Sequence, residues 1–254
     1  MLRSSATPTI ALLTLALTLP TAGAWPAAAA SPSTHAAAGV ASIRDDADAR
    51  TSLPRPTGPH AVGRDTLHLV DGARRDPWVP DRARELMIGM FYPALPGTGT
   101  PAPEHRHRNT GTGTPAPYAT VREAGLFLKS FGLDGAFPAE TLSATATNGR
   151  VGAWPDRRRH PLVVLSPGFG VSRFTLTGLA EELAGRGFVV AAMDHAYESV
   201  GTAFSGGRML TCIACERARN EQDLEAVTAG RAKDVSSCKG CEFARHVAGA
   251  PPRR

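Results

Sequence analysis

Two short apolar runs on either side of an amphipathic segment constrain the fold of this chain more than any other feature. The runs are "PLVVLSPG" (161–168) and "FVVAAMDH" (188–195), and the segment between them is "RFTLTGLAEELAGRG" (173–187). Short continuous apolar runs are typical of strands buried on both faces of a parallel sheet. The middle segment has helical spacing and a glycine-rich end. A strand, a helix and a strand within about thirty residues predict a right-handed crossover, so the fold class is α/β.

The residues before this unit predict an antiparallel hairpin. "AVGRDTLHLVD" (61–71) alternates loosely between apolar and polar residues, and "ELMIGMFYP" (85–93) is a second strand-like run. A turn with two prolines separates them, which favours pairing across a long connection.

Two further segments have the spacing of amphipathic helices. The first covers 119–132 and the second covers 216–237. Apolar residues that recur every three or four positions are expected to face the core. In the first helix these are Val121, Leu126, Phe127, Leu128 and Phe131, and in the second they are Leu224, Val227 and Val235.

The N-terminus has the pattern of a secretory signal peptide. An apolar stretch, "IALLTLALTL" (10–19), is too short to span a bilayer and is followed by small residues with cleavage-like spacing. We therefore expect a signal peptide over 1–30, a flexible lead-in over 31–56 and a secreted protein. No other stretch is long and apolar enough to predict a membrane span.

The positive charge does not indicate a nucleic-acid partner. The chain carries a net charge of +5 at pH 7, with a pI near 9.4. Its arginines form short scattered clusters, and no aromatic residues lie between them as stacking platforms. A solvated basic surface is the better interpretation, and no nucleic acid is expected as partner.

The most informative loop is Pro167-Gly168-Phe169-Gly170, directly after the first apolar run. Ligands bind at the carboxyl ends of strands in open α/β sheets, and glycines let backbone N–H groups face a ligand there. Such amides can hold the negative oxygen of a tetrahedral intermediate in acyl transfer. From these residues alone, an ordinary strand-to-helix turn remains the alternative.

Four blocks of the sequence resemble one family. They are "TGPHAVGRDTLHLVD", "RELMIGMFYPA", "PLVVLSPGFGVSRFTLTGLAEELAGRGFVVAAMDHAYES" and "LEAVTAGRAKDVS". Together they are similar to the bacterial secreted α/β-hydrolases of the platelet-activating-factor acetylhydrolase group, often named lipases or dienelactone-hydrolase-like enzymes. The resemblance covers about 57–236 and is most specific over 161–198. It implies the N-terminal part of an α/β-hydrolase sheet, in which a hairpin precedes the parallel unit.

The resemblance also implies site residues and a reaction. The amide of Phe169 would supply one oxyanion-hole N–H, with Gly168 and Gly170 shaping the loop. Members often have His-Gly where this chain has Pro-Gly, and this departure leaves the backbone role intact. The implied reaction is hydrolysis of a short-acyl ester, typically on a phospholipid, with a serine, a histidine and an aspartate and without a cofactor or metal.

The family's nucleophile lies in a G-x-S-x-G elbow, which is absent from this sequence. We therefore assign no catalytic residue and expect an incomplete hydrolase domain over 57–236, an atypical tail over 237–254 and an inactive, truncated chain. No local motif gives Ser166 or Ser172 a base, and Asp194-His195 is interpreted as structural. The strand over 162–165 is expected to present an open, apolar edge.

The four cysteines form two C-x-x-C pairs, Cys212 with Cys215 and Cys238 with Cys241. This spacing resembles a zinc site, and a secreted binding module stabilised by zinc or disulfides is the alternative function. An oxidising compartment favours a disulfide, for which Cys212–Cys215 is the candidate. The sequence leaves open all three full pairings.

Overall fold

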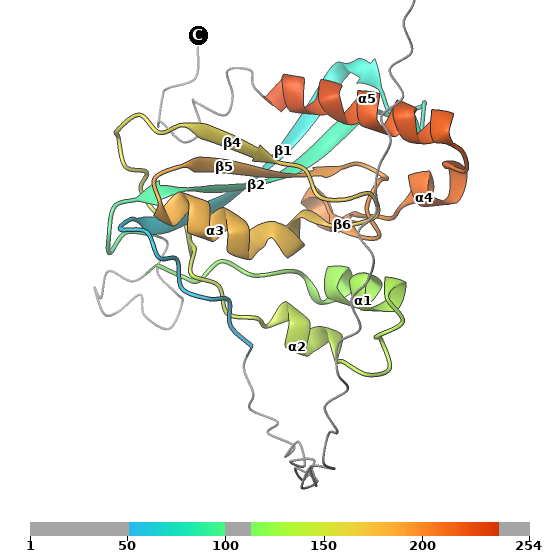
Figure 1. Ribbon diagram of the computed structural model, residues 1–254. Helices are drawn as coiled ribbons and strands as arrows, with labels where there is room; N and C mark the ends of the chain where they lie inside the picture. The colour runs from blue at the N-terminus through green and yellow to red at the C-terminus, as the bar shows by residue number, and fades with distance from the viewer. Residues whose placement is uncertain (1–50, 100–112, 239–254) are drawn as a thin grey trace, which may run out of the picture. The chain divides into compact units, whose positions relative to one another are not determined.

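The computed structural model describes residues 51–99 and 113–238 (Figure 1). The predicted signal peptide (1–30), most of the lead-in (31–50) and the end of the tail (239–254) lie outside the described residues. No helix within the described ranges is long and apolar enough to cross a membrane.

The described residues form a mixed five-stranded sheet in the order β3-β1-β2-β5-β4, and a two-stranded ribbon, β6-β7. The strands are β1 (Ala61–Arg75), β2 (Ala83–Ala94), β3 (Arg150–Val151), β4 (Leu162–Leu165), β5 (Val189–His195), β6 (Thr202–Ala203) and β7 (Met209–Leu210). The helices are α1 (Val121–Ser130), α2 (Ala139–Ser143), α3 (Thr177–Gly185), α4 (Ile213–Arg217) and α5 (Glu221–Cys238), with 3₁₀ turns at Arg173–Leu176 and Ser205–Gly207.

The predicted hairpin and crossover are both present. Strands β1 and β2 pair antiparallel, and β4 and β5 pair parallel with α3 between them along the chain. Strand β5 is buried along its whole length because it lies between β2 and β4. Strand β4 lies at an edge of the sheet, as expected, and its first residue, Leu162, is 39% exposed. The α/β fold class is therefore confirmed.

Helices cover both faces of the sheet (Figure 1). On one face, Ala180 and Ala184 of α3 pack against Phe91 and Val190. The cluster on the other face contains apolar residues of β2 and β5, and Val235 of α5 packs against it. Because successive strand residues point to opposite faces, β2 and β5 supply side chains to both clusters.

Three residues predicted to face the core are exposed instead. Val121 is 46%, Phe131 59% and Leu224 48% exposed. Val121 is the first residue of α1 and Phe131 its C-cap, whereas the buried residues of the helix lie between them. The second predicted helix begins later than expected: α5 starts at Glu221, and Leu224 lies in its first turn.

The fold also includes residues assigned to the lead-in. The Leu53 N–H donates to the Ala146 carbonyl at 2.9 Å, and the Ala146 N–H donates to the Thr51 carbonyl at 2.8 Å. Backbone pairing with the rest of the fold therefore begins before residue 57.

Candidate active site

The loop after β4 is held by backbone bonds to the segment that follows β5. The Gly170 N–H donates to the Glu198 carbonyl at 3.0 Å, and the Val200 N–H donates to the Gly170 carbonyl at 3.0 Å. Gly170 has a φ of +80°, a left-handed conformation that glycine adopts without a steric penalty. The glycine loop after β4 and the segment after β5 therefore meet where these parallel strands end.

Phe169 directly precedes Gly170 in this loop and is 37% exposed. Among residues 51–99 and 113–238, no hydrogen bond uses the Phe169 N–H. An amide in this position is available to a ligand at the carboxyl end of the sheet.

The fold joins Ser166, His195 and Asp234 in a chain of hydrogen bonds. Ser166 Oγ lies 2.9 Å from His195 Nε2, and His195 Nδ1 lies 2.7 Å from Asp234 Oδ2. Ser166 is exposed, whereas the histidine and the aspartate are buried. This is the order of groups used in nucleophilic catalysis by serine. Sequence reasoning missed it, because the histidine and the aspartate come from distant segments.

The carboxylate at the end of this chain is shared with two arginines. Arg84 contacts both carboxylate oxygens of Asp234, with Nη2 at 2.6 Å from Oδ2, and Arg74 contacts Oδ1 at 2.8 Å. Burial by itself raises the pKa of Asp234, but hydrogen bonds from His195 and Arg84 outweigh burial and hold that pKa well below its ordinary value. A carboxylate that is already paired with guanidinium groups stabilises a neighbouring imidazolium less than an unpaired carboxylate does.

Asp194 and His195 face opposite sides of the sheet, as neighbouring strand residues do. The Arg173 N–H donates to Asp194 Oδ1 at 2.6 Å, and the Arg173 guanidinium pairs with the same carboxylate. Asp194 therefore has a partner of its own and does not orient the histidine. Ser172 is buried and donates to the Gly201 carbonyl at 2.7 Å, so it is occupied structurally.

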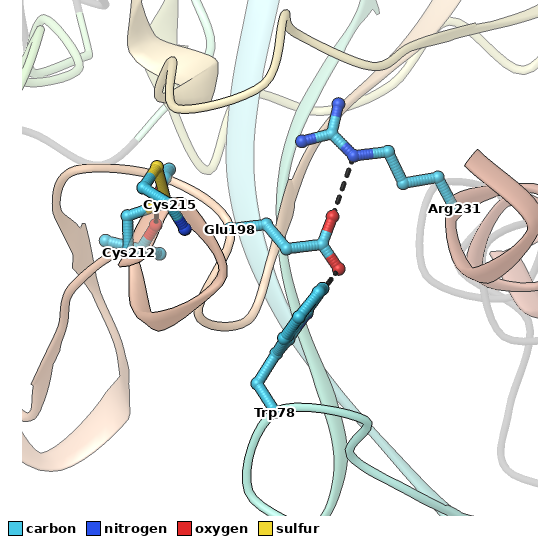
Figure 2. The surroundings of a disulfide bond; sticks show 7 residues. Trp78, Glu198, Cys212, Cys215 and Arg231 are labelled. Atoms are coloured by element: carbon cyan, nitrogen blue, oxygen red, sulfur yellow. Dashed lines mark hydrogen bonds and ion pairs between the residues drawn. A yellow bond between two sulfur atoms is a disulfide. The ribbon is translucent and has the colours of Figure 1, made fainter. Parts of the chain in front are cut away.

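A buried glutamate connects helix α5 with the loop (Figure 2). Glu198 accepts hydrogen bonds from Trp78 Nε1 at 3.1 Å, Arg84 at 2.7 Å and Arg231 Nε at 2.8 Å. Arg231 also donates to the Pro167 carbonyl at 2.7 Å. Helix α5 thus contacts the loop directly.

A disulfide joins Cys212 and Cys215 beside the same loop (Figure 2). A Cβ atom built on Gly170 would lie 3.6 Å from Cys215 Sγ, which is ordinary van der Waals contact. The side chain of Cys238 and all of Cys241 lie outside the described residues. Within the described part of the chain, no three His, Cys, Asp or Glu residues are arranged to hold a metal ion.

The family of platelet-activating factor acetylhydrolase, isoform II, matches residues 46–208. This chain belongs to that family. A probable 1-alkyl-2-acetylglycerophosphocholine esterase of Arthroderma benhamiae is 29% identical over 168 residues, which are 63% of this chain and 41% of the relative. The ferulic acid esterase of Streptomyces cinnamoneus has a similar solved structure, with a TM-score of 0.60 and 39% identity, over 75% of this chain and 48% of that one.

Membership in the acetylhydrolase family agrees with the resemblance in the sequence, and both relatives are named as esterases. The chain spans less than half of the length of either relative. The family match covers β4, the glycine loop and β5, but ends before α5. The contacts of α5 with the loop therefore lie outside the family match.

Proposed function

We propose that this chain belongs to a carboxylic ester hydrolase in which the Phe169 amide binds the oxyanion. The observation that carries the proposal is the Phe169 N–H, which makes no hydrogen bond to any described residue and lies in the loop that directly follows β4. Fixed amide donors of this kind stabilise the negative oxygen of acyl transfer without reorganising during the reaction. The named activities of the relatives support a carboxylic ester as substrate, and the glycerophosphocholine esterase supports a short acyl group on a phospholipid.

We further propose that the chain as it stands does not turn over esters. Its sequence contains no G-x-S-x-G elbow. Ser166 is the serine with a histidine in reach, but the aspartate behind that histidine is paired with Arg84 and Arg74. Such pairing weakens the carboxylate's support for the imidazolium that a serine nucleophile requires.

Inactivity is tested with a fluorophosphonate probe and p-nitrophenyl acetate on the purified full chain. We expect neither covalent labelling nor serine-dependent release of nitrophenol. Labelling of Ser166 that persists in Ser172→Ala and disappears in Ser166→Ala would show that the Ser166–His195–Asp234 chain is catalytic. It would overturn the proposed inactivity while leaving the ester-hydrolase assignment intact.

The oxyanion role is tested by titrating the chain with the ethyl methylphosphonate anion, which mimics the charge and shape of a tetrahedral intermediate. NMR should show a downfield shift of the Phe169 amide proton, while the Gly170 amide, already bonded to Glu198, changes less. Phe169→Pro, which removes the donor, should weaken binding, whereas Phe169→Leu should retain it. A Phe169 amide that does not respond at saturating phosphonate would contradict the role.

We also propose that the protein is secreted and that a signal peptide within residues 1–30 is removed. The short apolar stretch and the small residues after it support this. Mass spectrometry of the protein exported from a bacterial host should give a mature N-terminus shortly after Ala24 or Ala30. Full-length protein retained in the cytoplasm would contradict it.

The zinc-stabilised module gains no support from the described cysteines. Cys212 and Cys215 are joined to each other, and sulfur atoms in a disulfide do not serve as thiolate ligands. The ester-hydrolase proposal is therefore preferred to the zinc alternative.

A further inference from the structure

We propose that Arg231 is a positioning residue for the oxyanion loop, which it ties to helix α5. The inference rests on the proposed role of the Phe169 amide and adds the side chain that holds this amide in place. Neither the glycine motif nor the family match reaches Arg231, which lies beyond residue 208.

The guanidinium of Arg231 bridges two partners. Nε donates to Glu198 Oε2 at 2.8 Å, and Nη1 donates to the Pro167 carbonyl at 2.7 Å. Its central carbon also lies 5.8 Å from the centre of the Phe169 ring, within the range of a cation–π contact. The planar guanidinium carries its donors in a rigid fork, so the two hydrogen bonds fix the peptide at Pro167 relative to Glu198.

Glu198 fixes the other end of the same loop. Its backbone carbonyl accepts the Gly170 N–H at 3.0 Å, while its side chain accepts Arg231. The pair therefore holds the loop at Pro167 and at Gly170. Phe169 lies between these points, and its own N–H keeps no partner among the described residues. A loop held on both sides of a free amide is arranged to present that amide in one orientation.

The pair is anchored inside the protein. The Glu198 side chain is 1% exposed and is held by Arg84 and Trp78, whereas the Arg231 side chain is 15% exposed (Figure 2). Ion pairs between exposed side chains contribute little because water and salt screen them, but a desolvated, hydrogen-bonded pair is screened much less. Arg231 can therefore transmit the position of α5 to the loop.

Amide hydrogen exchange, measured by NMR on the full chain, tests this inference without requiring ester turnover. In Arg231→Ala, we expect the Gly170 amide to exchange about tenfold faster, because the loop opens locally when a charge-assisted bond is lost. Ala191 in the middle of β5 should keep its protection. Lys233→Ala removes an exposed cation from the same helix and should leave the exchange rates of both amides unchanged.

Two further measurements separate positioning from general support of the fold. The Gly170 amide should exchange almost as fast in Arg231→Lys as in Arg231→Ala, because an ammonium lacks the fork that spans Glu198 and Pro167. Methylguanidinium added to Arg231→Ala should restore much of the Gly170 protection. Unchanged exchange at Gly170, equal acceleration at Ala191, or full rescue by lysine would each overturn the inference.

These outcomes are independent of the function proposed above. If the Phe169 amide ignores the phosphonate in a chain whose Gly170 is protected through Arg231, the oxyanion role fails and the structural coupling stands. If Phe169 responds to the phosphonate equally in Arg231→Ala and in the unmodified chain, the positioning role fails and the oxyanion role stands.

Discussion

Arg84 on β2 and Asp234 on α5 face each other inside the protein, with both carboxylate oxygens within 3.2 Å of the guanidinium. Their side chains are 2% and 0% exposed. Arg84 also pairs with Asp76 and Glu198, so one guanidinium contacts carboxylates from three parts of the chain. Replacing both members of a buried ion pair with apolar residues can leave the stability unchanged, but removing one member leaves the other charge buried and unpaired.

Arg84→Met should therefore be strongly destabilising. It keeps much of the side-chain volume but removes the only cation paired with Asp76 in the described structure, and it leaves Asp234 and Glu198 with one arginine fewer each. We expect a loss of about 3–5 kcal/mol in the free energy of unfolding, measured with urea at pH 7. Arg208→Met is the control, because Arg208 pairs with Glu85 nearer the surface and should cost less than about 1 kcal/mol. Similar losses in the two variants would contradict the importance of burial.

Stability should fall in acid partly because of Asp234. Its pKa is lowered in the folded protein, whereas an unfolded aspartate titrates near 3.9. The stabilisation from this carboxylate is therefore fully present above pH 5 and is lost as the pH falls through 4 and below. Urea midpoints between pH 6 and pH 3 should decline less steeply in Asp234→Asn, although that variant starts from a lower stability. An unchanged slope would show that Asp234 does not titrate differently on folding.

Two glycine-to-alanine changes should have opposite effects. A Cβ atom at Gly58 would lie 2.0 Å from the Gly185 carbonyl oxygen, so the backbone must move, and we expect a clear loss of thermal stability. Gly230 lies in α5 with nothing within 4 Å of a built Cβ. Gly230→Ala should stabilise by about 0.5–1 kcal/mol, because alanine loses less backbone freedom in a helix. Thermal unfolding followed by circular dichroism checks both, and equal effects would contradict the close approach at Gly58.

Reduction of the Cys212–Cys215 disulfide should have a modest effect. Only three positions separate the two cysteines, and the loop-entropy relation gives about 2 kcal/mol for so short a loop. Urea unfolding with and without a phosphine reductant measures this difference, and Cys212→Ser/Cys215→Ser should match the reduced protein. Complete unfolding on reduction would mean that the bond supports more of the fold than its short loop indicates.

The main strands of the sheet could be predicted because each has a recognisable pattern within its own short stretch of sequence. The runs that form β4 and β5 are apolar without interruption, and β5 is buried along its length. The apolar run by itself predicts burial of both faces of β4, but Leu162 is 39% exposed because β4 lies at the edge expected for it. Strand β3 has two residues, which is too short for a periodic pattern to register.

The buried charges could not be predicted in this way. Arg84 and Asp234 are 150 positions apart, and each lies in a polar stretch that resembles a solvated surface. Only the assembled fold brings α5 over the end of the sheet, where its charged side chains meet those of β2 and Glu198. For the same reason, the sequence predicted the glycine loop but not the arginine that holds it.

The position of β4 has a consequence for how such a protein can be assembled. Within the described sheet, β4 pairs only with β5, and no described strand lies along its other edge. A segment that added there in parallel would end beside Phe169. The open edge of β4 is therefore a suitable boundary at which to divide a hydrolase into two separately expressed polypeptides that complement each other in trans.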